Sequence, residues 1–100
     1  MTIEGKKYDS GKRRWGLMPW GALGHVVDVL QFGAEKYGPH NWIHVENARE
    51  RYTDALLRHV TARQMGHVLD PESGRPHLAH AACCILFLIA LETGSDDHLR

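Results

Sequence analysis

Histidines and acidic residues gather around one short stretch in the second half of the chain. His77 and His80 are three residues apart, so they share one face of a helix. Asp70 and Glu72 precede them on a polar link, and His59 lies on the apolar stripe of the preceding helix, so its side chain points inward. Imidazoles and carboxylates together can bind a divalent metal or supply acid–base groups. The pattern predicts a metal site formed by Glu72, His77 and His80, with Glu72, His59 and Asp70 as catalytic groups.

A structural role is the alternative for the same side chains. A lone histidine on an apolar stripe is usually a hydrogen-bonded core residue, and this applies most directly to His59. Cys84 follows His80 by one helical turn, next to Cys83. Adjacent cysteines have the wrong spacing for a structural disulfide or a zinc knuckle, which favours a reducing, cytoplasmic setting.

Basic residues dominate the first 14 positions. Five Lys or Arg residues stand there against two acidic residues, which gives a local net charge of +3 in a chain whose overall net charge is zero. Lys12 and Arg13 follow Gly11, with Trp15 close behind. Basic side chains beside a glycine turn can hold phosphate, so Lys12 and Arg13 are predicted phosphate contacts. A solvated basic tail is the alternative.

A second group of nucleotide-binding candidates lies between residues 33 and 42. Lys36 offers a charge, Asn41 an amide, and Tyr37 and Trp42 aromatic rings. These are the groups that read a nucleotide, because bases stack on aromatic rings and phosphates pair with cations. In the alternative interpretation, Tyr37 and Trp42 close the base of the helical core.

The apolar periodicity that positions these residues is helical. Gly38-Pro39, Gly66 and Gly94 mark the ends of three segments. One hundred residues suffice for one domain, so we expect a single all-α domain over 1–100 with three main helices. Its parts are an extended basic arm over 1–18, a helical core over 19–94 with helices at 19–37, 48–65 and 76–93, and an acidic tail over 95–100.

The third predicted helix is apolar nearly all round between Ala81 and Leu91. A surface helix would show a polar face, and two other helices offer little to surround this one. We therefore expect a homo-oligomer, a helical bundle assembled through this helix. The run is too short for a membrane span, and the net charge of zero argues against general nucleic-acid binding.

Four blocks in the same order resemble the phage and prophage family of dATP/dGTP diphosphohydrolase N-terminal domains. The resemblance covers about residues 7–91. The matching blocks are Lys7–Lys12, Gly33–Trp42, Ala55–His59, and Asp70–Gly74 with His77–Ala81.

The resemblance implies an all-α fold related to the MazG-like nucleotide pyrophosphohydrolases, which cut a nucleoside triphosphate between its α and β phosphates. It implies a purine nucleotide ligand, a divalent cofactor such as Mg²⁺ or Mn²⁺, and a nucleotide contact at Arg58 within a matching block. Two positions depart from the family pattern, because His67 stands where many members have Glu and Cys84 where many have Asn. The acidic helix pairs of the wider superfamily are absent.

Three functions follow as hypotheses. The first is metal-dependent hydrolysis of a phosphoanhydride bond in a purine deoxynucleoside triphosphate, in the cytoplasm of a phage's bacterial host. The second is a protein that binds and sequesters a nucleotide without turnover, including a cyclic signalling nucleotide of a host defence system. The third is a structural interaction protein without a ligand. Turnover separates the first from the second, because only an enzyme releases product.

Overall fold

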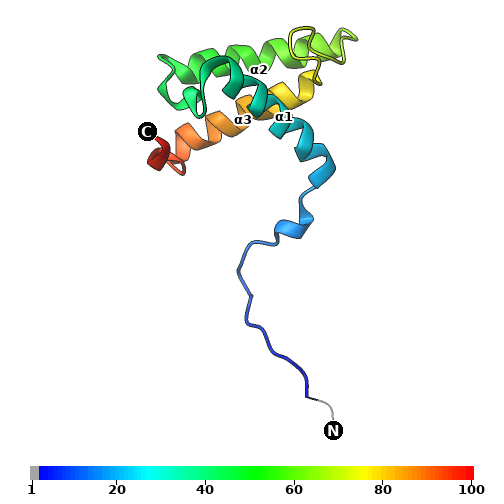
Figure 1. Cartoon of the computed structure of the whole chain (residues 1–100), viewed down its shortest axis with the longest axis vertical. Coiled ribbons are helices and arrows are strands. Elements are labelled where there is room, and N and C mark those ends of the chain that lie inside the picture. The colour runs from blue at the N-terminus through cyan, green and yellow to red at the C-terminus, as the bar shows by residue number, and fades with distance from the viewer. Residues whose placement is uncertain (1–2) are drawn as a thin grey trace.

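The computed structural model describes residues 3–100, and these residues form helices with no β-strand (Figure 1). The three main helices confirm the predicted all-α fold, and their bounds lie within one residue of those expected from the sequence. In chain order the elements are the 3₁₀ turn Trp15–Leu17, α1 Trp20–Tyr37, the 3₁₀ turn Asn41–His44, α2 Ala48–Gln64, α3 His77–Thr93 and the 3₁₀ turn Asp97–Leu99.

Glycines end two of the helices, as predicted. Gly38 and Gly94 have φ angles of +93° and +71°, a region that costs glycine little, and their N–H groups close the last turns of α1 and α3. Pro76 stands immediately before α3, where its missing N–H leaves no helical hydrogen bond unmade.

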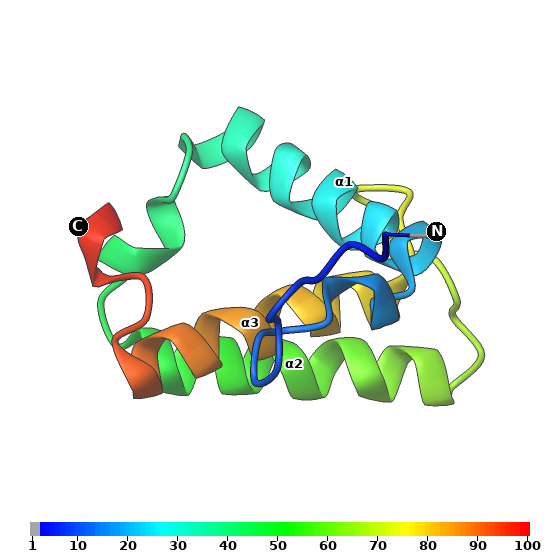
Figure 2. The same cartoon turned by 90° about the horizontal axis from the view of Figure 1, so that it is seen from below.

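The helices pack around α3. Figures 1 and 2 show α2 and α3 running antiparallel side by side, while α1 crosses over α3. The small residues Ala79 and Cys83 let α1 approach, and Val29 of α1 is buried against them. The Cys83 thiol lies 3.5 Å from the carbonyl oxygen of Val26, and burial raises the pKa of this thiol to about 12, so it stays protonated.

An aromatic cluster packs against the C-terminal half of α3. Phe87 of α3 stacks on Trp42, with ring centroids 4.8 Å apart and planes 10° apart. Tyr52 of α2 meets the edge of Phe87 at 5.0 Å. These contacts hold the Asn41–His44 turn against α2 and α3, and they occupy one face of the Trp42 ring.

The core is thin. Among the described residues, no large side chain is fully buried, and most buried positions on α3 are alanine or cysteine. On its outer side α3 exposes about half of each of three large side chains, which we call the α3 apolar face: Ile85, Leu86 and Ile89. Oligomerisation through α3 stays a prediction.

The chain before Trp15 runs away from the helical body (Figure 1). Residues 3–14 form no helix or strand, and every side chain is exposed. The turn expected around Gly11 is present, with the Lys12 N–H donating to the Asp9 carbonyl oxygen at 3.0 Å and a Gly11 φ of +80°. The first two residues of the predicted arm lie outside the described part of the chain.

The C-terminal residues fold back onto the body. Arg100 donates a hydrogen bond to the carbonyl oxygen of Ile43, which joins residues 95–100 to the Asn41–His44 turn. Within residues 3–100, no helix combines the length and the apolar character that crossing a bilayer requires.

Candidate functional site

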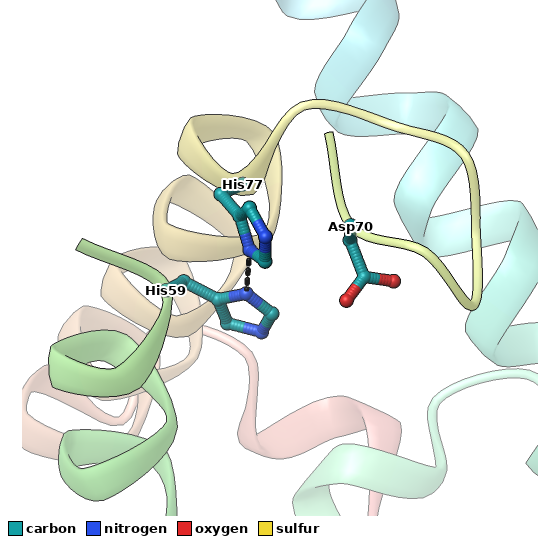
Figure 3. Close-up of side chains that lie close together, drawn as sticks. All are labelled: His59, Asp70 and His77. Atoms are coloured by element: carbon teal, nitrogen blue, oxygen red, sulfur yellow. Dashed lines mark hydrogen bonds between the residues drawn. The ribbon is translucent and has the colours of Figure 1, made fainter. Parts of the chain in front are cut away.

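Two histidines from neighbouring helices meet at the start of α3 (Figure 3). His59 projects from α2 and is half-buried, as its position on the apolar stripe predicts, while His77 is the first residue of α3 and only 6% exposed. Their Nδ1 atoms are 2.9 Å apart. One imidazole must therefore donate a proton to the other, or both nitrogens must face a shared cation.

Asp70 faces these histidines from the link between α2 and α3 (Figure 3). The link is a tight turn: the Asp70 N–H donates to the Arg75 carbonyl oxygen, and the Gly74 N–H donates back to the Asp70 carbonyl oxygen, both at 2.8 Å. Leu69 and Pro76 form a single β-bridge at its base. The turn thus fixes Asp70 while α3 begins immediately after it.

Ser73 joins Asp70 to a third histidine. Its backbone N–H and hydroxyl both donate to Asp70 Oδ2, at 2.9 and 3.0 Å, and its Oγ lies 2.6 Å from His80 Nε2. Because the hydroxyl has one proton, this arrangement is satisfied when His80 donates to Ser73 and Ser73 donates to Asp70. The His80 ring also stacks on His59, with centroids 4.6 Å apart.

The surroundings favour neutral imidazoles and an ionised carboxylate. Burial lowers the pKa values of His59 and His80, and repulsion from His77 lowers both further, although Asp70 opposes the effect. Burial acts to raise the pKa of Asp70, but the hydrogen bonds from Ser73 outweigh it, so the pKa falls below its usual value.

His59, Asp70 and His77 lie close enough together that they could hold a metal ion. One ligand atom from each lies within 4.8 Å of the others. Two nitrogens bound to one ion at about 2.1 Å each lie roughly 3.0–3.4 Å apart, close to the 2.9 Å between these Nδ1 atoms. Neutral imidazoles and a carboxylate are the protonation states that ligation needs, so the donor set fits a divalent metal.

This set differs from the predicted Glu72, His77 and His80. The Glu72 carboxylate forms an ion pair with Lys36 of α1. The Nε2 atom of His80 faces Ser73. Both residues stay beside the group, because burial lowers the pKa of His80 and the charge of Glu72 partly opposes this, while His80 Nε2 lies 3.6 Å from Asp70 Oδ2.

The ion pair of Lys36 with Glu72 is one of two that tie α1 to the turn. Arg75 Nη1 lies 3.2 Å from Asp28 Oδ2, two helical turns before Lys36. The ammonium of Lys36 also lies 5.1 Å from the centre of the Tyr37 ring, which is exposed. Lys36 and Tyr37 therefore lie at the edge of the turn that carries Asp70.

The other predicted nucleotide contacts are scattered. Arg58 is exposed on α2 next to His59, whose pKa its charge lowers. Asn41 is exposed, and Trp42 packs on Phe87, about 15 Å along α3 from His77 at 1.5 Å per residue. Lys12 and Arg13 lie on the segment that runs away from the body, where the Arg13 guanidinium lies 5.8 Å from the centre of the Trp15 ring.

Sequence reasoning did not single out Ser73. The signal was available, because an Asp followed three residues later by Ser and then Gly favours a turn closed by the Asp side chain. Cys84, one helical turn after His80, is buried, and burial raises the pKa of its thiol.

Comparisons with known proteins show which family this chain is similar to. The family model described as dATP/dGTP diphosphohydrolase, N-terminal, matches residues 2–98. A protein of Salmonella phage PMBT28 named dATP/dGTP diphosphohydrolase is 37% identical over 98 residues, which cover 95% of this chain and 33% of that protein. The chain thus spans about a third of the length of the relative it matches. No solved structure matches it significantly.

Proposed function

Because the chain belongs to the dATP/dGTP diphosphohydrolase N-terminal family, we propose that it binds a purine deoxynucleoside triphosphate and hydrolyses a phosphoanhydride bond. One observation carries this proposal: in a chain of this family, two imidazoles and a carboxylate converge within 4.8 Å. The relative comes from a phage, so the substrate would be met in the cytoplasm of an infected bacterium.

His59, Asp70 and His77 would hold the divalent metal, which supplies Lewis-acid stabilisation of phosphate charge when bound. Two nitrogen donors suit Mn²⁺ better than Mg²⁺, because Mg²⁺ prefers oxygen ligands and retains its water. His80 and Ser73 would hold Asp70 in its ionised, oriented form, since both face its Oδ2 atom.

Lys36 and Glu72 would act together on the substrate. A phosphate group that binds Lys36 competes with the Glu72 carboxylate for the same ammonium, and Glu72 is then free to accept a proton. A water oxygen forms a bond to phosphorus, the bridging P–O bond breaks, and Glu72 takes the water proton. Arg58, Tyr37 and Asn41 remain proposed contacts to the rest of the nucleotide.

The test is incubation of purified protein with a panel of purine and pyrimidine triphosphates, each with and without Mg²⁺ or Mn²⁺. Chromatography of the products reports both turnover and the bond cleaved. The proposal expects metal-dependent loss of dATP or dGTP and release of pyrophosphate with the monophosphate. Nucleotides recovered unchanged and unbound under all conditions would contradict it.

Sequestration without turnover is the second candidate, and one observation favours it. The matched segment is a third of the relative, so the activity in that protein's name belongs to a longer chain. The same side chains would then bind nucleotide while chemistry is done elsewhere. Recovery of the nucleotide bound but chemically intact decides for this candidate.

A further inference from the structure

We infer that the basic segment before α1 acts on a second copy of the chain, bringing Lys12 and Arg13 to the partner's histidine site. We call residues 3–14 the arm. The inference rests on the proposed nucleotide function for its ligand, while its geometry can be tested without any nucleotide.

Two of the cations beside the histidine site are already paired within the chain. Lys36 is paired with Glu72, and Arg75 is paired with Asp28. Arg58 contributes one further charge beside His59. A triphosphate carries several negative charges and is held in proteins by several charge-assisted hydrogen bonds. Unpaired cations from another segment would therefore strengthen the hold on the phosphates.

The arm, by contrast, carries positive charges that no carboxylate of the described residues pairs with. Between residues 3 and 100, none of its five cations forms an ion pair, and the contacts described for the arm are with its own neighbours. Its own helical body does not cover it (Figure 1). Large apolar side chains on and just after the arm are also uncovered, with Tyr8 83%, Trp15 60% and Leu17 70% exposed. Such a segment needs a surface to lie on.

A second copy of this chain supplies that surface. The chain exposes 7927 Å², whereas a folded monomer of 11.3 kDa exposes about 5,700 Å², an excess of roughly 2,200 Å². A standard interface buries about 800 Å² per partner, and obligate dimers bury more. The extended arm and the α3 apolar face both contribute to this excess, which is large enough to supply the area that a stable dimer buries.

The arm is long enough to reach a neighbour. Eight residues separate Lys12 from Trp20, and at about 3.3 Å per residue a fully extended chain would span at most roughly 26 Å, less where Trp15–Leu17 form the 3₁₀ turn. The two shorter dimensions of the molecule are 33 and 23 Å. The reach of the arm is thus comparable with the width of a neighbouring subunit.

Mixed oligomers test the inference. The arm variant is Lys12→Ala with Arg13→Ala, which alters only exposed residues, and the site variant is Asp70→Asn, with His80→Ala as a second site variant. Hetero-oligomers are co-expressed with two affinity tags and purified through both. Each parent alone should lose at least nine-tenths of wild-type dATP or dGTP turnover. In the hybrid, the intact arm of one subunit meets the intact site of the other.

The inference expects the hybrid dimer to regain about half of the wild-type turnover. A hybrid that stays at the level of its parents means that the arm serves its own chain, which overturns the inference. An arm variant with wild-type turnover overturns it as well. If the wild type itself turns over no nucleotide, the proposed function fails, and the arm is judged by the cross-linking measurement alone.

That measurement is carbodiimide cross-linking of mixed ¹⁴N- and ¹⁵N-labelled protein, read by mass spectrometry. The inference expects about half of the links between arm lysines and Asp70 or Glu72 to join a light chain to a heavy chain. The link between Lys36 and Glu72 is the internal control, because this pair lies within one chain and must stay single-isotope. Arm-to-site links that are only single-isotope, or absent, overturn the inference.

Discussion

The Nδ1 atoms of His59 and His77 lie 2.9 Å apart, although the two residues come from antiparallel helices. Two protonated imidazoles cannot share this separation, because both nitrogens would then carry a proton and a positive charge. The contact holds with one shared proton or with a metal ion. The histidine site therefore depends on neutral imidazoles, which has consequences for stability as well as for ligation.

The first prediction concerns stability against pH. The pKa values of His59 and His80 are lowered in the folded chain, so below about pH 6.5 the unfolded chain binds more protons than the folded one. The free energy of unfolding should consequently fall as pH falls from 7 to 5. Thermal melts across this range should show a Tm that decreases by several degrees.

The matched variants are His80→Gln and His25→Gln. His25 is exposed on α1, so its removal should leave the pH dependence of Tm unchanged. Replacement of His80 should flatten it. A wild-type Tm that is constant or rises towards pH 5 would show that the buried imidazoles are not the groups that titrate.

The second prediction concerns Ser73. Ser73→Ala removes the hydroxyl that joins Asp70 to His80, which leaves both half-buried groups short of a hydrogen bond. The expected loss in the free energy of unfolding is about 1–3 kcal/mol, measured by urea denaturation. Ser10→Ala, at an exposed position on the arm, should change it by less than about 0.5 kcal/mol. Equal stability of the two variants would contradict the bridging role.

The third prediction distinguishes two roles of Glu72, accepting a proton from water and binding the metal. Glu72→Gln breaks an exposed ion pair, so urea denaturation should show a stability close to that of the wild type. If Glu72 accepts the proton from water, the turnover number should fall by about 10² or more while the metal affinity stays the same. A large loss of metal affinity would instead return Glu72 to the ligand set.

The fourth prediction concerns assembly. Ile89→Lys places a charge on the α3 apolar face, where the native side chain is 50% exposed in a single chain. Light scattering should show a wild-type mass that is a multiple of 11.3 kDa and a smaller mass for the variant. Gln64→Lys, at an exposed polar position on α2, is the control and should keep the wild-type mass. A wild-type monomer at micromolar concentration would rule the assembly out.

Local signals account for what the sequence predicted well. Helix bounds followed from apolar periodicity and from glycines at Gly38 and Gly94, which act over a few residues. The position of His59 on the apolar stripe of its helix predicted that its side chain points inward. These features depend on neighbours within one or two helical turns, so a single sequence carries them.

The parts that the sequence did not predict depend on contacts between distant segments. Glu72 faces Lys36, 36 residues earlier, because α1 crosses over α3 beside the turn, and no spacing rule encodes that approach. Trp42 meets Phe87 for the same reason. The contact between His59 and His77 likewise depends on how α2 and α3 align, which no spacing along one helix encodes.

Calorimetric titration of Mn²⁺ into the nucleotide-free protein at pH 7.5 tests the central claim most directly. The account predicts saturable binding of one ion per chain, weakened at least tenfold by Asp70→Asn or His59→Gln and weakened in the wild type as pH falls below about 6.5. Circular dichroism of each variant confirms that its helices are intact. No binding by the wild type, or equal binding by folded variants, would contradict the claim that these side chains form a metal centre.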